Sequence, residues 1–163
     1  MRVAKKSLVL HPTEGKWYYN ELPFSGEAVV FYPNGLMAEI VRYKGGKKDG
    51  MSQKWFEDGS KQREATYCSN RLQGVVKSWW PNCVLSAKSY YSNGIRQGIQ
   101  SKWYPNGQLS RQNRIVDGKE EGLQQAWRRN GKLYANYEAK NGRVFGLKRS
   151  NLCYALKDEI VQR

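Results

Sequence analysis

The sequence predicts an all-β protein in which stacked β-hairpin repeats form a single elongated antiparallel meander. The first observation behind this class is a strict 24-residue period with no insertion or deletion. Its marker is a glycine that opens each unit: Gly26, Gly50, Gly74, Gly98, Gly122 and Gly146. The second is a β-favouring aromatic segment in each unit that ends in a reverse-turn signal. The third is that each unit contains at least two helix breakers and no sustained 3.6-residue apolar stripe, which argues against helices.

The outward strand and its turn occupy the first part of each unit. With the glycine as position 0, positions 1–6 are about one strand long and end in two mostly aromatic positions. In "SKWYPNGQLS" at 101–110, Pro105 presets the first turn angle, Asn106 tolerates the second, and Gly107 takes the left-handed residue that follows. We therefore expect a type I turn followed by a left-handed residue. In the third unit Cys83 replaces this glycine, which predicts a hairpin that is strained by about 1 kcal/mol or differently turned.

The return strand is predicted over positions 10–17, and a glycine or asparagine at position 20 indicates a second reversal. One hairpin cannot bury its own apolar face, so neighbouring units must stack. We expect the core to form from the position-5 aromatics, the leucines at position 11 and the apolar residue at position 1 of the next unit. The position-6 aromatics should point to the other face. Ten to twelve strands about 4.8 Å apart would give a ribbon roughly 50–60 Å long.

Three segments follow from this period. Residues 1–25 should cap the N-terminal end, residues 26–145 should form five 24-residue repeats, and residues 146–163 should cap the C-terminal end. In the C-terminal cap we expect a strand in "NLCYAL", with a short helix after Asn151 as the alternative. Because edge strands at either end would leave backbone groups unpaired, we also expect homo-oligomers through these edges.

The charge is strongly positive. The 163 residues include 28 Lys and Arg against 14 Asp and Glu, a net charge of +14. Residues 65–116 contain seven basic residues and no acidic one. Such a surface should attract an acidic protein, a nucleic acid or an anionic lipid, or else serve only to keep the protein in solution.

Catalytic chemistry is not expected. The chain has one histidine, His11, with no nucleophile motif beside it, and it lacks HExxH, GxSxG and P-loop patterns. Acidic residues cluster in one loop, where solvation is the simpler interpretation: Asp117, Glu120 and Glu121. We predict that the protein is not an enzyme and has no catalytic residues, no metal and no cofactor.

Three cysteines are widely spaced: Cys68, Cys83 and Cys153. No CxxC is present, so we expect small buried or half-buried residues rather than a disulfide framework or zinc site. The run "LVL" near the start is too short for a signal peptide, and no 18-residue apolar run predicts a membrane helix. The expected location is therefore cytoplasmic, although a leader lost before residue 1 would leave no trace in this sequence.

The repeat unit resembles a known family. The pattern "G-x4-W-Y-P-N-G-x-L-x5-Y-x2-G-x3-G" resembles the MORN-variant repeat, and "PFSGEAVVFYPNG" followed by "YKGGKKDG" is similar to the bacterial YwqK-family antitoxins. The resemblance covers about residues 16–146. It implies an elongated β-hairpin sheet and a scaffold that binds proteins or anionic lipids, with an antitoxin or immunity role for the bacterial variant. Lys61 in place of leucine and Arg128 in place of an aromatic residue depart from the pattern.

The expected function is a repeat binding module that neutralises or scaffolds an acidic protein partner, such as a toxin, through an extended basic face. Variable polar residues at positions 3 and 13 are the expected contacts. The candidate partner-binding residues are Arg63, Lys77, Arg111, Arg114, Trp80, Tyr104 and Arg128.

Nucleic-acid binding is the alternative, because basic residues alternate with aromatic ones in "KSWW", "SKWY" and "AWRRN", where phosphates could be held while bases stack. Binding to an anionic membrane would be purely electrostatic and salt-sensitive.

Overall fold

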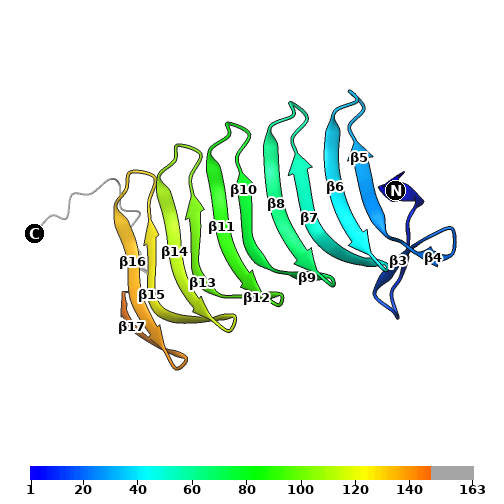
Figure 1. Ribbon diagram of the computed structural model, residues 1–163. Coiled ribbons are helices and arrows are strands. Elements are labelled where there is room, and N and C mark those ends of the chain that lie inside the picture. The colour runs from blue at the N-terminus through cyan, green and yellow to red at the C-terminus, as the bar shows by residue number, and fades with distance from the viewer. Residues whose placement is uncertain (148–163) are drawn as a thin grey trace, which may run out of the picture.

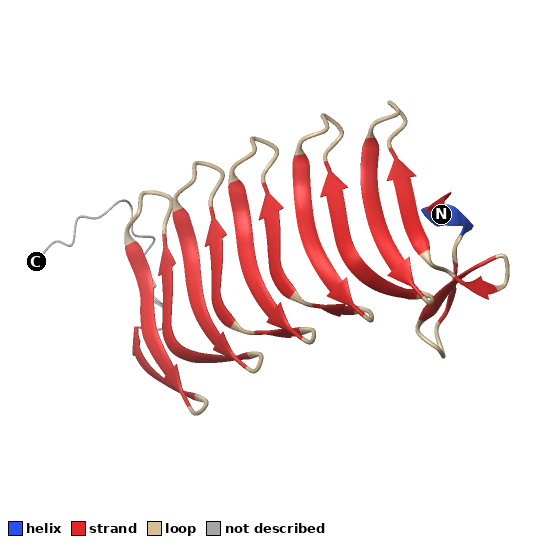
Figure 2. Ribbon diagram, viewed as in Figure 1, coloured by secondary structure: helices blue, strands red, loops and turns tan. Residues whose placement is uncertain are grey.

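The computed structural model describes residues 1–147, and most of their strands belong to one long sheet that runs the length of the molecule (Figures 1 and 2). The sheet has 14 strands, and a separate three-stranded sheet lies near the N-terminus. Within residues 1–147 there is a single 3-10 turn and no α-helix, so the predicted all-β class is confirmed. The strand and the alternative helix expected after residue 150 lie outside the described residues.

The elements follow the chain in order. The N-terminal ones are β1 (Arg2–Ala4), η1 (Lys5–Ser7), β2 (Val9–His11), β3 (Lys16–Tyr19) and β4 (Leu22–Pro23). The repeat strands are β5 (Gly26–Phe31), β6 (Met37–Lys44), β7 (Lys47–Trp55), β8 (Lys61–Cys68), β9 (Arg71–Leu72), β10 (Gly74–Trp79), β11 (Leu85–Ser92), β12 (Ile95–Arg96), β13 (Gly98–Trp103), β14 (Leu109–Val116), β15 (Lys119–Trp127), β16 (Leu133–Lys140) and β17 (Arg143–Leu147). From β5 to β17 the long strands pair with their sequence neighbours in antiparallel fashion, and β1 pairs with β5 in parallel.

The turns at one end of the hairpins have the predicted conformation. In the fourth unit the Gly107 N–H donates to the Tyr104 carbonyl at 2.9 Å, and the Tyr104 N–H donates to the Gln108 carbonyl at 2.9 Å. Gly107 has φ +84°, so it is the left-handed residue after the turn. Cys83 makes the same N–H contact in the third unit, to the Trp80 carbonyl at 2.9 Å, and its φ is 64°. The third hairpin therefore has the same turn as the others, with strain at Cys83.

The turns at the opposite end link one unit to the previous one. Asp117 and Gly118 both have positive φ, 49° and 78°, as a type I′ turn requires. The Asp117 N–H donates to the Gln97 side chain at 3.1 Å, and the Gly118 N–H donates to the Arg96 carbonyl at 3.0 Å. Gln97 and Arg96 belong to the preceding repeat, so each reversal also joins two units.

The two faces of the sheet differ in burial. We define the inner face as the face that carries positions 2, 4, 13, 15 and 17 of each unit. The outer face is the face that carries positions 1, 3, 5, 14 and 16. Apart from Gly46 in a turn, the buried residues of the repeats lie on the inner face, with Val29 and Ser101 as the exceptions. At the N-terminal end, Leu8 and Phe24 pack with Val41 and Tyr43 of the inner face in the main hydrophobic cluster.

This distribution corrects the predicted core. The position-5 tryptophans are on the outer face and only half-buried, and Phe31 at the same position is exposed. The position-1 residues expected to pack beside them are also exposed: Met51, Val75, Ile99 and Leu123. The core instead uses small and aliphatic side chains on the opposite face, where the N-terminal elements cover the first units.

Candidate binding face

A row of directly paired residues crosses six neighbouring strands on the inner face. Each member lies opposite the next in the register of β7, β8, β10, β11, β13 and β14. We call these residues the inner row: Lys54, Arg63, Ser78, Ala87, Lys102 and Arg111. The row has a pair of basic residues at each end and two small side chains in the middle. Beyond Arg111 the register continues into the buried alanines Ala126 and Ala135, and beyond Lys54 it continues into Glu39 and Val30.

Most of the charge in this row has no acidic partner. Lys54 Nζ lies 3.4 Å from Glu39 Oε1, and Glu39 also binds Lys5 of the N-terminal segment. Within residues 1–147, no carboxylate lies within ion-pair distance of Arg63, Lys102 or Arg111. Like charges directly opposite each other destabilise a sheet by a few tenths of a kcal/mol, up to about 1 kcal/mol. The Lys102 and Arg111 pair therefore opposes folding, whereas the charge of Lys54 is offset by Glu39, which lies directly opposite it on β6.

Lys48 also lies on the inner face, close to several other cations. It is half-buried, and its Nζ lies 5.3 Å from the centre of the Tyr67 ring. Burial lowers the pKa of Lys48, and the positive charges of Lys5, Lys54 and Arg63 lower it further against the opposing effect of Glu39. The N-terminal half of the inner face is thus already crowded with positive charge.

Two open grooves flank the inner row. One, of about 510 Å³, is lined by Lys54, Arg63 and Trp80 among others, and the second, of about 550 Å³, is lined by Trp80, Lys102 and Tyr104 among others. Trp80 borders both grooves and therefore lies between the two basic pairs. Its indole N–H donates to the Trp103 carbonyl at 3.0 Å, which fixes the ring while leaving 36% of the residue exposed.

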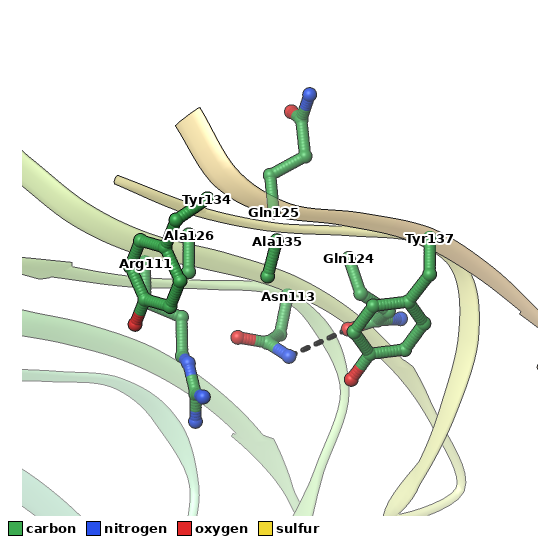
Figure 3. Close-up of a pocket in the computed structure, with 8 residues that line it drawn as sticks. All are labelled: Arg111, Asn113, Gln124, Gln125, Ala126, Tyr134, Ala135 and Tyr137. Carbon is green, nitrogen blue, oxygen red and sulfur yellow. Dashed lines mark hydrogen bonds between the residues drawn. The ribbon is translucent and has the colours of Figure 1, made fainter. Parts of the chain in front are cut away.

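A polar pocket of about 400 Å³ adjoins Arg111 at the C-terminal end of the row. Figure 3 shows Asn113 and Gln124 on the same side of the sheet as Arg111, whereas Gln125 points to the other side. The Asn113 amide donates to Gln124 Oε1 at 2.7 Å, and Gln124, which is fully buried, donates to the Arg114 carbonyl at 2.7 Å. These amides satisfy one another, so the pocket offers a neutral, hydrogen-bonding surface next to Arg111.

The carboxylate of Glu120, also on the inner face, accepts two hydrogen bonds. Tyr137 donates to Glu120 Oε2 at 2.8 Å, and Asn113 donates to Glu120 Oε1 at 3.2 Å. Burial raises the pKa of Tyr137, and the hydrogen bond to Glu120 raises it further. Glu120 is therefore held by neutral donors and forms no ion pair with Arg111.

The predicted partner-binding residues do not form one surface. Arg63 and Arg111 belong to the inner row, and Trp80 and Tyr104 border its grooves. Lys77 and Arg114 lie on the outer face, where Lys77 is opposite Glu64 and Lys88, and Arg114 is opposite Ile99. Arg128 follows β15 at the turn. Positions 3 and 13, expected to act together, are on opposite faces.

Two residues of the row, Lys54 and Lys102, were not among the predicted ones. The turn alone does not reveal them, because a three-residue hairpin turn places position 5 opposite position 11 and would place position 4 opposite position 12. A β-bulge next to the turn shifts the register by one residue, and this shift brings Lys54 opposite Arg63 and Lys102 opposite Arg111.

The structure also shows the surroundings of the histidine and of two of the three cysteines. The His11 ring stacks on Tyr18 with the ring centres 4.1 Å apart. Cys68 and Cys83 are free and exposed, which corrects the expectation that they are buried or half-buried, and Cys153 lies outside the described residues. In the part of the chain that the structure describes, no three His, Cys, Asp or Glu side chains are grouped as a metal site would need. The described residues also contain no helix long and apolar enough to cross a membrane.

Comparisons with known proteins agree with the repeat. The family described as "MORN repeat variant" matches residues 96–113, which include β13, the Pro105–Gly107 turn and part of β14. Residues 96–113 are thus a MORN-type repeat, and an array of repeated hairpins like the one in this sheet is typical of a binding module. The search of curated proteins found no match.

Among solved structures, TarM matches with 14% sequence identity over 71% of this chain and 21% of that chain, at a TM-score of 0.37. An S. aureus TarM mutant in complex with Fondaparinux, alpha-GlcNAc-glycerol and UDP matches with 13% identity over 72% of this chain and 21% of that chain, at the same TM-score. The match spans about a fifth of the length of each of those chains.

Proposed function

We propose that the chain is a non-enzymatic repeat binding module that binds an acidic protein partner through the inner row. The observation that carries the proposal is the direct opposition of Lys102 and Arg111 on neighbouring strands, with no carboxylate within ion-pair distance of either among the described residues, although Glu120 lines a small pocket beside them. Uncompensated like charges oppose folding, and an acidic ligand would offset that cost. Neutralisation of the partner, as by an antitoxin or immunity protein, is the role that the resemblance of the repeat unit favours.

The rigidity of the array supports this function. Backbone pairing runs through the whole sheet, and side-chain hydrogen bonds join the repeats at both ends of the hairpins. A preformed surface needs little ordering when a partner binds, so more of the interaction energy remains as affinity. Trp80 supplies an exposed aromatic group of the kind that anchors protein interfaces.

A second candidate function is nucleic-acid binding on the outer face. There Lys77 lies directly opposite Lys88, and the half-buried Trp79 and Trp103 belong to the same face. This arrangement combines cations with aromatic rings, as single-stranded nucleic-acid binding requires. Lys61 already lies over the Trp79 ring, with Nζ 5.6 Å from its centre, which reduces the surface on which a base could stack.

Affinity capture tests the proposal. The full chain is used as bait in native lysate, with nuclease-treated and untreated halves washed at 50 and 200 mM salt. We expect one acidic protein that survives nuclease and salt, and that binds again in equimolar amount when both proteins are purified. Bound material that disappears with nuclease, or that falls steeply with salt as phosphate contacts do, would contradict a protein ligand.

A further inference from the structure

The distance between the two basic pairs defines a spacing that a ligand must match. Lys54 and Arg63 lie on β7 and β8, whereas Lys102 and Arg111 lie on β13 and β14. In the order of the sheet the centres of the two pairs are four strand intervals apart. At about 4.8 Å per interval this separation is about 19 Å. An extended peptide advancing about 3.3 Å per residue covers it in about six residues.

The middle of the row differs from its ends. Ser78 and Ala87 are small, uncharged and directly paired, so they leave space above the sheet between the basic pairs. Trp80, which borders the grooves on both sides, provides an aromatic surface at this level. The row thus presents cation pair, apolar centre and cation pair in sequence.

We propose that the inner row binds an extended acidic segment of a protein, in which two acidic clusters about six residues apart flank an apolar residue. One cluster contacts Lys54 and Arg63, and the second contacts Lys102 and Arg111. The apolar residue packs on Trp80 above Ser78 and Ala87. This inference rests on the proposed function and specifies the chemistry and spacing of the ligand.

The uneven charge of the row favours a peptide over a nucleic acid. A nucleic-acid strand carries a phosphate at every nucleotide, so the phosphates above Ser78 and Ala87 would meet no cation. Trp80 is the one exposed tryptophan among the described residues, so a strand held by the inner row would find a single exposed indole rather than a succession of stacking platforms. An acidic peptide can place its charges at the two ends only and use its centre for apolar contact.

A series of fluorescently labelled peptides tests the spacing. Each peptide contains two Asp-Asp clusters and one central leucine in a Gly-Ser background, with cluster centres three, six or nine residues apart. All three have the same charge. Each peptide is named below by its spacing, so the six-residue peptide is the one whose cluster centres are six residues apart. Fluorescence anisotropy with the full chain at 150 mM salt should show the six-residue peptide binding about tenfold more tightly than the three-residue peptide, because only the former reaches both pairs. Equal affinity at all spacings would overturn the proposal.

Two double variants make the test specific. Replacing one pair, by Lys102→Ser with Arg111→Ser, should weaken the six-residue peptide about tenfold and remove the dependence on spacing, because the remaining pair cannot sense it. Lys140→Ser with Arg143→Ser is the matched control, since these cations also lie opposite each other but flank a distant turn. That variant should retain both affinity and spacing dependence. Equal loss in the two variants would show attraction by net charge alone and would contradict the proposal.

An oligodeoxynucleotide of equal charge completes the experiment. The proposal would be overturned in favour of a nucleic acid by two results together. The oligonucleotide would bind more tightly than the six-residue peptide, and the Lys102→Ser, Arg111→Ser variant would lose this oligonucleotide binding. If a purified acidic partner binds in equimolar amount but the peptides show no dependence on spacing, this inference fails while the proposed function holds. If neither the partner nor any peptide binds, both fail.

Discussion

The Tyr104 hydroxyl donates a hydrogen bond to the backbone carbonyl of Trp127, one repeat further along the chain, at 2.9 Å. Tyr32 makes the same bond to the Trp55 carbonyl at 2.7 Å, and the Trp80 indole makes it to Trp103 at 3.0 Å. The position-6 aromatic residue is therefore a joint between consecutive units. Its repeated use explains why the aromatic-turn phrase recurs with the same period as the fold.

Removal of one such bond should lower stability. We predict that Tyr104→Phe reduces the free energy of unfolding by about 1 kcal/mol, because the Trp127 carbonyl loses a donor from the neighbouring unit. Urea denaturation followed by tryptophan fluorescence measures the change. Tyr90→Phe is the control, since the exposed Tyr90 hydroxyl has no partner among the described residues and should leave stability unchanged. Equal losses in both variants would show that the inter-unit bond has no special role.

The second unit offers the reverse experiment. Phe56 occupies position 6 there and has no hydroxyl, so this side chain cannot donate a hydrogen bond to the Trp79 carbonyl. We predict that Phe56→Tyr adds the missing bond and raises the free energy of unfolding by about 0.5–1 kcal/mol. Thermal unfolding followed by circular dichroism would reveal this, and a lower melting temperature would contradict the assignment.

Cys83 should be replaceable by the residue that its turn favours. Because Cys83 has φ 64°, Cys83→Gly should relieve backbone strain and stabilise the protein by about 1 kcal/mol. Gly107→Ala at the equivalent position of the next unit should destabilise it. An added Cβ at Gly107 would meet no atom within 4 Å, so that loss would come from the backbone alone. If the urea midpoints of Cys83→Gly and Gly107→Ala shift in the same direction from the wild type, this account is contradicted.

Because of Tyr43, the folding stability of the protein should change with pH in the alkaline range. Burial, and then the negative charge of Glu39, raises the pKa of Tyr43 to about 12, and its buried hydroxyl has no hydrogen-bond partner among the described residues. Because the folded pKa exceeds the unfolded value near 10, its contribution is fully present below pH 10 and is lost as the pH rises towards 12.

Tyr43→Phe should therefore flatten the fall in melting temperature between pH 10 and 12. At pH 7 it should also stabilise the protein by about 1 kcal/mol, because an unsatisfied buried hydroxyl is removed. The exposed Tyr90→Phe serves as control and should keep the wild-type pH profile. A Tyr43→Phe profile as steep as that of the wild type would contradict the role of this hydroxyl.

The Lys102 and Arg111 pair should reduce the stability of the free protein. We predict that Lys102→Ser raises the free energy of unfolding by a few tenths of a kcal/mol, because Arg111 no longer faces a like charge. Arg42→Ser is a suitable comparison, since Arg42 Nε lies 3.1 Å from Glu27 Oε1 and its loss should not stabilise. Urea denaturation at low salt gives the sharpest difference, because salt screens these charges. A destabilised Lys102→Ser would contradict the like-charge interpretation.

Local chemistry made much of the fold predictable. The Pro105, Asn106 and Gly107 turn follows from the backbone preferences of three adjacent residues, and the exact period carries that conformation to the other units. The buried face could not be derived in the same way. Both faces carry apolar side chains, and the choice between them depends on distant contacts such as Phe24 with Tyr43.

The candidate site was predictable only in part. Arg63 and Arg111 were expected from their variable position, but Lys77 and Arg114 were grouped with them because sequence position alone does not show which face a side chain takes. Strand alternation separates the two sets once the register is known. Lys102 became a candidate only when its direct opposition to Arg111 showed two cations with no carboxylate within ion-pair distance among the described residues.

The most direct test of partner binding through the inner row compares two variants that remove the same charge from opposite faces. Lys54→Ser with Arg63→Ser removes an inner pair, and Lys77→Ser with Lys88→Ser removes the outer pair. Isothermal titration of each with the purified acidic partner at 150 mM salt measures the change in Kd. Binding through the inner row predicts about tenfold weaker binding for the inner variant and less than a twofold change for the outer one. Weakening of the outer variant alone would contradict it and place the partner on the tryptophan face.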